Sequence, residues 1–371
     1  MNEYLFLTPA PLSTSQTVKQ AMLTDWCLID KDYSNDIFKT VTNKLVKLAC
    51  EGPMQRQYAA VLLSGNSVNS IETLLNSVLT SDETLLVINN GRQSQAVLDI
   101  ATMLGIKTRE YALAYDQTVD VNQLGELLKQ YKDISHVYVV HCQSCSGLLN
   151  PLAECCQLIK SHHKTLIVDA ISTFGGISLD VNKLAIDYLI GSAEQGLQSV
   201  AGLFFVIANQ AKLHQCEGKS KSFSLDLYQH YKIQAQLQHQ NNTLFAPSAQ
   251  LVAALHQALI ELDDEGGIAA RALRFGVNQK LLCQGMQSLG FKPLLSKSAQ
   301  SPIVTCFAAP QHKSYAFEHF YQLLKHQGFI IFPGDIDGVD CFRMGNIGQV
   351  YPADIKSALI TIEKCRYWLR E

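Results

Sequence analysis

Short apolar runs alternate with amphipathic stretches through the first two thirds of the chain. The runs are rich in Val, Ile and Leu, which is typical of strands buried on both faces of a sheet. The stretches between them have helical periodicity, which predicts crossover helices and a mainly parallel sheet in an α/β protein. Seven such runs lie at residues 59–64, 85–89, 108–112, 136–141, 165–169, 186–192 and 202–208.

The pattern changes after residue 248, where two long helical stretches run to about residue 264 and then to about residue 289. A second set of short elements follows, which predicts a smaller C-terminal α/β domain. We expect an N-terminal segment packed on that domain (1–20), a large domain (21–255) and the small domain (256–371). Within the small domain, strands are predicted at 303–308, 329–332 and 341–344, and helices at 315–327 and 353–368.

Loops rich in small polar residues follow five of the seven predicted strands. In open parallel sheets, ligands bind outside the carboxyl ends of the strands. These loops are therefore expected to line one pocket, and they lie at residues 65–69, 90–94, 141–147, 169–174 and 192–198.

Composition excludes several classes of partner. The 371 residues are 47% apolar and 17% charged, with a formal net charge of −3. There is no cluster of basic residues for nucleic acid and no apolar run of the ~18–20 residues that span a bilayer, so neither partner is expected. The 11 cysteines are scattered, which predicts reduced thiols in a cytoplasmic protein. Cys142 and Cys145 have C-x-x-C spacing, but no second pair stands at zinc-finger spacing, and no metal is expected.

Four stretches of the sequence resemble the class V aminotransferases, which are fold-type I pyridoxal-phosphate enzymes. They read LTPAPLSTSQTVKQAM at 7–22, IVDAISTFGG at 167–176, SFSLDLY at 222–228 and FPGDIDGVDCFRMGNIG at 332–348. The resemblance is collinear from about residue 5 to residue 368, and within the family it is closest to the 2-aminoethylphosphonate–pyruvate aminotransferases. It implies pyridoxal phosphate as cofactor, a small amine or keto acid as ligand, and a homodimer with the pocket at the two-fold interface.

The resemblance assigns two cofactor-binding regions. Asp169, which follows a predicted strand, matches the partner of the cofactor's ring nitrogen; a helix N-cap or a buried ion pair is the alternative. The turn Gly65-Asn66-Ser67 matches the phosphate-binding turn in altered order, and an ordinary strand-to-helix turn is the alternative. In the family a partner-subunit threonine also reaches the phosphate; at that place Ala246 cannot donate, and Ser248 is the remaining hydroxyl.

Two further positions depart from the family pattern. Gln93 stands where relatives carry the aromatic residue that stacks on the cofactor ring, which removes a contact worth about 1 kcal/mol beyond area burial. The loop that lines the cofactor face reads Gln143-Ser144-Cys145-Ser146-Gly147, and Ser144 is its expected cofactor contact.

The stretch Ser192-Ala193-Glu194-Gln195 stands where relatives carry the Schiff-base lysine. Gln195 takes the lysine position, and its amide is not a nucleophile, so covalent cofactor binding is not expected there. Ser192 and Glu194 are assigned to the cofactor site with it. A Glu194 carboxylate ~4 Å from the phosphate would cost on the order of 4 kcal/mol, which weakens non-covalent binding as well.

Arg343 in CFRMGN matches the family's arginine for the substrate carboxylate, where a bidentate guanidinium fits best. A structural ion pair in the small domain is the alternative for this residue.

Three interpretations of function remain open. The first is a degenerate family member that lacks normal transaminase activity and acts as a ligand-binding protein, a regulator or the partner of an active paralogue. The second is a working transaminase that moves an amino group from 2-aminoethylphosphonate or a similar amine to pyruvate, with a lysine from elsewhere. The third is a cofactor-free reaction that uses Cys145 or His141. For each of these two residues, a purely structural role is the alternative.

Overall fold

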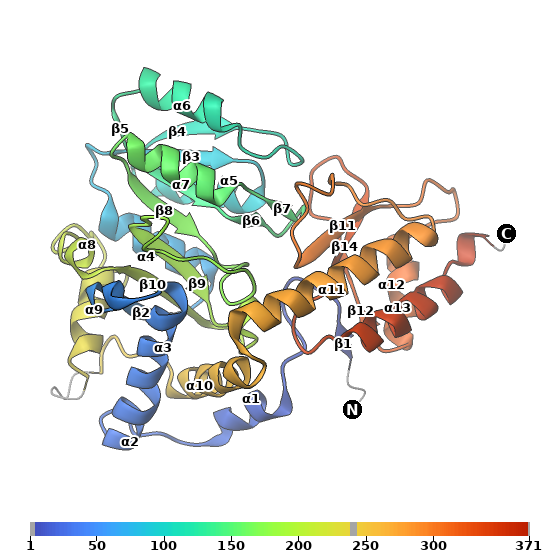
Figure 1. Cartoon of the computed structure of the whole chain (residues 1–371), viewed down its shortest axis with the longest axis horizontal. Helices are drawn as coiled ribbons and strands as arrows, with labels where there is room; N and C mark the ends of the chain where they lie inside the picture. The colour runs from blue at the N-terminus through green and yellow to red at the C-terminus, as the bar shows by residue number, and fades with distance from the viewer. Residues whose placement is uncertain (1–3, 238–242, 370–371) are drawn as a thin grey trace.

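The computed structural model describes residues 4–237 and 243–369, and residues 1–3 and 370–371 of the predicted outer segments lie outside them. A larger body contains the central sheet, and a smaller body contains the C-terminal third of the chain. The long helix α11 (Gly267–Ser288) runs from one body to the other (Figure 1). Within the described ranges, no helix is long and apolar enough to cross a membrane.

The central sheet has seven strands in the order β2-β10-β9-β8-β5-β3-β4. All seven predicted runs form strands of this sheet, with ends displaced by two residues or fewer. Only β10 is antiparallel to its neighbours, so the remaining strands share one direction. The strands are β2 (Tyr58–Ser64), β3 (Thr84–Asn89), β4 (Lys107–Ala112), β5 (Ile134–Val140), β8 (Thr165–Asp169), β9 (Tyr188–Ser192) and β10 (Leu203–Asn209).

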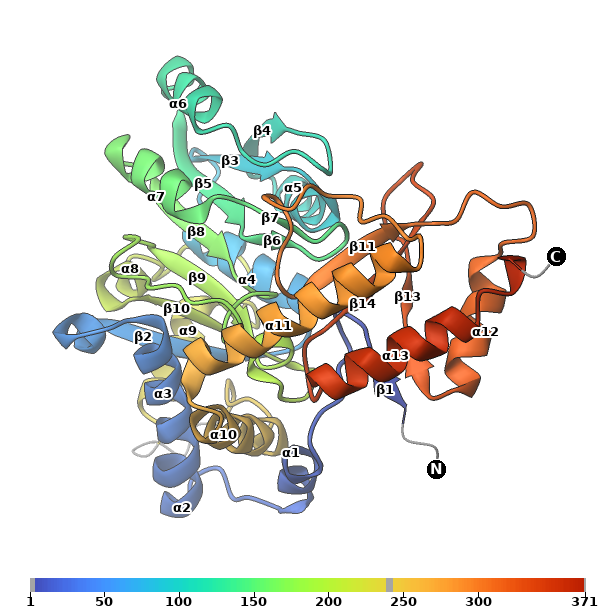
Figure 2. The same ribbon diagram turned by 45° about the vertical axis from the view of Figure 1, so that its right-hand side comes forward.

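Helices cover both faces of the sheet, which explains why its strands are almost continuously apolar. On one face pack α4 (Ser67–Val78), α5 (Arg92–Met103), α8 (Gln210–His214) and α9 (Leu227–Ala235). On the other pack α3 (Thr40–Ala49), α6 (Val121–Gln130), α7 (Leu152–Ser161) and α10 (Ala249–Asp264), as the two views show (Figures 1 and 2). Two short helices, α1 (Gln16–Gln20) and α2 (Lys31–Tyr33), lead into α3.

The smaller body has its own apolar core, centred on Phe307, Phe320 and Phe342. An antiparallel sheet, β11-β14-β13, packs with the helices there, and the N-terminal strand β1 pairs in parallel with β12. The elements are β1 (Leu5–Phe6), β11 (Val304–Ala308), α12 (Phe317–His326), β12 (Phe329–Ile330), β13 (Phe332–Pro333), β14 (Cys341–Gly345) and α13 (Pro352–Lys364).

Two expectations about this region differ from the structure. The segment predicted as one strand at 329–332 forms two short strands, β12 and β13, which are separated by Ile331 and pair in different sheets. The expected boundary between the large and the small domain, after residue 255, falls inside α10. Leu259 and Leu262, which follow this boundary, pack in the core of the larger body.

Candidate active site

The loops after β3, β5, β8 and β9 meet at the carboxyl edge of the sheet, where the sequence predicts the pocket. The His141 backbone N–H donates to the Asp169 carbonyl at 2.9 Å. The Ser192 hydroxyl donates to the Ile171 carbonyl at 3.1 Å. Asn90 donates to the Asn150 side chain at 2.8 Å, which joins the first two loops. Hydrogen bonds therefore fix these loops against one another.

Asp169 lies at the end of β8 and is only 4% exposed. Its carboxylate accepts hydrogen bonds from the Tyr138 hydroxyl at 3.1 Å and the Ile171 N–H at 3.0 Å. Burial raises the pKa of Asp169 to about 6. Its partners within the described ranges are a hydroxyl and a backbone N–H and no cationic side chain, so the alternative of a buried ion pair does not hold. Its chemistry suits pairing with a cationic ring nitrogen.

Gln195 begins a short 3-10 turn after β9 and is 8% exposed. Its φ is 60°, a left-handed conformation that costs a non-glycine residue about 1–3 kcal/mol unless the surroundings enforce it. The turn is tightly packed at the next residue, because a Cβ on Gly196 would collide with the Phe174 carbonyl and lie 2.6 Å from the Gly176 nitrogen. The backbone at Gln195, the residue that the resemblance matches to the Schiff-base lysine, is therefore strained, and its side chain has no amine.

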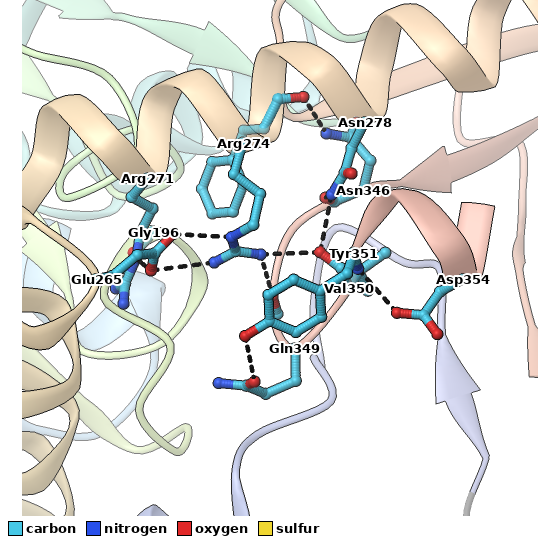
Figure 3. A network of polar contacts seen from close by, with 12 residues as sticks. Gly196, Glu265, Arg271, Arg274, Asn278, Asn346, Gln349, Val350, Tyr351 and Asp354 are labelled. Atoms are coloured by element: carbon cyan, nitrogen blue, oxygen red, sulfur yellow. Dashed lines mark hydrogen bonds and ion pairs between the residues drawn. The ribbon is translucent and has the colours of Figure 1, made fainter. Parts of the chain in front are cut away.

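A buried ion-pair network holds the same loop (Figure 3). Arg271 is 2% exposed and donates to the Gly196 and Leu197 carbonyls at 3.0 and 3.2 Å. Glu265 accepts from Arg271 at 2.7 Å and from Arg274 at 2.8 Å.

Arg274 extends the network into the smaller body, donating at 2.9 Å to the carbonyls of Gly348 and Val350. Burial raises the pKa of Glu265, but the hydrogen bonds from Arg274 and Arg271 outweigh it and the net shift is downward. One carboxylate therefore ties the turn at Gln195 to the smaller body.

Glu194 is half-buried next to Gln195. Burial raises the pKa of its carboxyl group, and in the part of the chain that the structure describes it forms no ion pair. An acidic group without a cationic partner disfavours an anionic ligand at this loop.

Gln93 and Gln143 occupy the space between the loops that follow β3 and β5. Gln93 Nε2 donates to the Ser144 hydroxyl, and Gln143 Nε2 donates to Asn90 at 3.1 Å and to Ser94 at 2.9 Å. The close approach of Gln143 Oε1 leaves room only for glycine at Gly91, since a Cβ there would lie 2.6 Å away. Amide groups thus stand where a stacking aromatic ring would be expected.

The turn Gly65-Asn66-Ser67 is folded as a capped start of α4. The Asn66 side chain accepts from the Asn69 N–H at 3.1 Å, and the Asn69 side chain accepts from the Asn66 N–H at 3.0 Å. This reciprocal capping box occupies the backbone N–H groups of Asn66 and Asn69, which a bound phosphate would need as hydrogen-bond donors. Ser248 lies beside the turn in the same chain, with its N–H donating to Ser64 at 3.4 Å.

Arg343 lies on β14 and faces the loop that contains Ser144. Its guanidinium donates to the Ser144 carbonyl at 3.5 Å and to the Pro333 carbonyl at 3.1 Å. It also pairs with Asp335 at 3.7 Å. The structural ion pair that the sequence left open therefore exists, and it lies beside the loop that contains Ser144.

The groups considered for a cofactor-free reaction are poorly suited to it. Burial raises the pKa of the Cys145 thiol, which keeps it protonated at neutral pH. Burial lowers the pKa of His141 to about 4, and its Nδ1 is 2.9 Å from the Thr173 hydroxyl. Both residues have the surroundings of structural groups.

The nearest lysines in sequence are engaged elsewhere. Lys183 pairs with Glu51 at 2.6 Å on the surface. Lys212 pairs at 3.6 Å with Asp187, which directly precedes β9 and so lies at the opposite edge of the sheet from Gln195.

These residues do not fit a covalently held pyridoxal phosphate, the cofactor that the resemblance implies. Asp169 suits the ring nitrogen, but Gln195 offers no amine, Glu194 adds a carboxyl group, and the turn at Asn66 is capped by its own side chains. We derive no reaction step through the cofactor.

Sequence reasoning missed the residues that support the site, namely Glu265, Arg271, Arg274, Arg92 and Asp335. The spacing of Arg271 and Arg274 on a predicted helix that begins near Glu265 was the available signal, because residues three apart share a helix face. Arg92 and Asp335 are distant in sequence and gave no such signal.

Comparisons with known proteins find relatives that match nearly the whole chain. The profile of the family described as Aminotransferase class-V matches residues 54–336. A 2-aminoethylphosphonate–pyruvate transaminase of Vibrio vulnificus (strain CMCP6) is 44% identical over 367 residues, 99% of each chain. One of Klebsiella pneumoniae subsp. pneumoniae is 42% identical over 365 residues, 98% of each chain. The structure of a pyridoxamine–pyruvate aminotransferase from Mesorhizobium loti aligns with a TM-score of 0.88 at 20% identity, covering 100% of this chain and 94% of the other. These likenesses confirm the fold expected from the sequence.

Proposed function

Because the chain belongs to the class V aminotransferase family, we propose that it is a family member that has lost covalent cofactor chemistry and retains a site for a small acid. The family depends on pyridoxal phosphate. The observation that carries the proposal is Gln195, which has no amine, lies in a packed, strained turn, and is the residue that the resemblance matches to the Schiff-base lysine. The retained arginine, Arg343, supplies the contact for a carboxylate or a similar anion.

The experiment is to add pyridoxal phosphate to the purified protein, record the visible spectrum, and reduce with borohydride before mass spectrometry. We expect no lysine adduct. An adduct on any lysine would contradict the proposal, and locating it would identify the substitute residue. Free cofactor bound without an adduct would agree with loss of the covalent step alone.

A second candidate is an active transaminase that moves an amino group from 2-aminoethylphosphonate or a similar amine to pyruvate. The observation that favours it is the identity to transaminases of that name over nearly the whole chain, together with the buried acid Asp169. Alanine formed from pyruvate in the presence of the amine and cofactor would support this candidate. No alanine, and no thermal shift on adding cofactor, would exclude it.

The proposal includes a cytoplasmic homodimer, since the resemblance places the pocket at a two-fold interface. A paralogue with an intact lysine could replace one subunit, which would give the degenerate chain a regulatory role. Co-expression with such a paralogue, followed by native mass spectrometry, tests whether mixed dimers form.

A further inference from the structure

Two buried cysteines of the smaller body, Cys306 on β11 and Cys341 at the start of β14, have their side chains in contact. Cys306 lies opposite Arg343 in the antiparallel register. Cys341 lies opposite Ala308, two residues further along β11, so the two cysteines are diagonal neighbours on one face of the sheet. Their side chains are hydrogen-bonded to each other, and both are free thiols that are at most 6% exposed. We call this pair the strand dithiol.

The strand dithiol faces the larger body. Phe307 and Phe342 alternate with the cysteines along β11 and β14 and pack in the core of the smaller body. The opposite face, which carries the cysteines, also carries Arg343, whose guanidinium donates to the Ser144 carbonyl at 3.5 Å. The strand dithiol therefore lies close to the candidate site without belonging to it.

The Cys341 sulfur is packed against the start of the loop that joins β13 to β14. The Gly334 N–H donates to the Cys341 carbonyl at 2.9 Å, and a Cβ on Gly334 would collide with Cys341 Sγ. The sulfur also accepts a hydrogen bond from the Asp335 N–H. It therefore anchors the beginning of the loop at residues 334–340.

The two thiols of the pair differ in how readily they ionise. The hydrogen bond from Cys306 lowers the pKa of Cys341, and the nearby Arg343 guanidinium acts in the same direction, so that together they outweigh burial. The same hydrogen bond and burial raise the pKa of Cys306. The pair is thus arranged as a thiol that donates to a thiolate, and the thiolate is the form that reacts with oxidants.

We propose that Cys306 and Cys341 are a peroxide-sensitive dithiol that forms a reversible disulfide beside the candidate site. The Cys341 thiolate attacks one oxygen of hydrogen peroxide, so that an S–O bond forms, the O–O bond breaks, and the released hydroxide takes a proton from solvent. Cys306 then loses its proton and attacks the Cys341 sulfur, and the S–O bond breaks as the S–S bond forms. The leaving hydroxide takes that proton and becomes a second water. Two electrons therefore pass from the two thiols to the peroxide.

The position of the pair on the sheet favours a bridge that is easily reduced. Diagonal neighbours on antiparallel strands are about 7–8 Å apart, whereas the Cα atoms of a relaxed disulfide are about 4.4–6.8 Å apart. Closing the bridge therefore requires β11 and β14 to shift and stores strain. Strained disulfides are reduced more readily than structural ones, which suits a reversible modification.

The bridge is expected to loosen the loop that carries Asp335. A sulfur bonded to Cys306 carries no negative charge and is displaced toward β11, so the Asp335 N–H loses its acceptor. The Asp335 carboxylate pairs with Arg92 and, at 3.7 Å, with Arg343, and these pairs join the two bodies. Oxidation of the strand dithiol would thus act on the contact between the bodies.

The test treats the reduced full chain with hydrogen peroxide, alkylates the remaining thiols under denaturing conditions and maps the cysteine peptides by mass spectrometry. We expect an intramolecular pair linked through Cys306 and Cys341, two hydrogens lighter than the reduced peptides, and its loss when reduced glutathione is added. No linked pair would overturn the proposal, and so would a bridge from either residue to Cys145, the third sulfur near them. A bridge that persists in glutathione would overturn its reversibility.

Hydrogen exchange tests the effect on the loop. Residues 334–340 should exchange faster in the bridged protein than in the reduced protein, because the Asp335 N–H has lost the Cys341 sulfur as acceptor. Equal exchange in the two forms would overturn the link between the strand dithiol and the loop.

Two variants identify the reacting sulfur. Cys306→Ser should stop the reaction at a sulfenic acid on Cys341, which dimedone traps as an adduct. Cys283→Ser is the matched control, because Cys283 lies in the same body and is more exposed, while burial raises its pKa. The control should form the bridge to the same extent as the wild type. A dimedone adduct mainly on Cys283, or equal loss of the bridge in both variants, would overturn the assignment of Cys341 as the reacting thiolate.

Thermal melting checks that each variant is folded, and the peptide map of the wild type needs no variant. These readouts are independent of the proposed loss of covalent chemistry. A lysine adduct with pyridoxal phosphate would overturn that loss and leave the thiol measurements intact.

Discussion

Replacing Glu265 by glutamine should destabilise the protein more than replacing any exposed acid. The substitution keeps the side-chain shape but removes the charge that Arg271 and Arg274 share (Figure 3). Arg271 is 2% exposed, so its guanidinium would remain buried without a counterion. Breaking a buried ion pair from one side costs about 3–5 kcal/mol.

The expected shift in melting temperature follows from chain length. An unfolding entropy of about 2.1 cal/mol/K per residue gives about 0.8 kcal/mol/K for the 371 residues as one cooperative unit. Glu265→Gln should therefore lower Tm by about 4–6 °C in a calorimetric scan. Hydrogen exchange should also become faster in the peptide that contains Gln195, because Arg271 holds the carbonyls of Gly196 and Leu197.

Asp263→Asn is the control for this prediction. Asp263 lies two residues before Glu265 and pairs with Lys44, but its side chain is 55% exposed. An exposed pair contributes about 1 kcal/mol or less, so the control should shift Tm by about 1 °C at most. Equal shifts in both variants would refute the argument that burial makes the Glu265 network important.

Three further predictions concern the site. Asp169→Asn should gain stability relative to the wild type as pH rises from 4 to 7, by up to about 4 °C in Tm. The folded-state pKa of Asp169, about 6, lies above the ordinary 3.8, so the free energy of unfolding of the wild type falls by about 3 kcal/mol over that range. The titration of His141 affects both proteins equally and does not contribute to the difference. Gln195→Lys alone should not restore alanine formation from pyruvate, and measurable turnover would show the other changes at the site to be unimportant. Iodoacetamide should modify the exposed Cys27 well before the buried Cys145, as peptide mass spectrometry can determine.

The strands of the central sheet could be predicted from the sequence because each strand is apolar over most of its length. Strands buried on both faces give a signal that does not depend on their neighbours. The segment 329–332 shows where this signal ends, since four consecutive apolar residues cannot reveal that the segment is divided between two sheets. The N-terminal helices were not assigned either, because their amphipathic pattern is short and interrupted.

The candidate site was predictable only in part. The position of Asp169 followed from its place after a strand, and the resemblance identified Gln195 as the lysine position. The capping of α4 could have been inferred from the sequence, because Asn66 is a favourable N-cap residue and Asn69, three positions later, carries a second side chain that can complete a capping box. The ion pair between Arg92 and Asp335 could not be inferred, because the packing of the two bodies brings these residues together.

The backbone and the side chain at Gln195 are under different constraints, and this explains how the site could change without loss of the fold. The left-handed turn is maintained by Gly196, which has no space for a Cβ, and by Arg271, which binds the turn from α11. Neither contact involves the Gln195 side chain. A substitution there therefore costs the fold little, whereas a change at Gly196 or Arg271 would disrupt packing. The strained turn is thus set by its neighbours, and its presence is not by itself evidence of chemistry at Gln195.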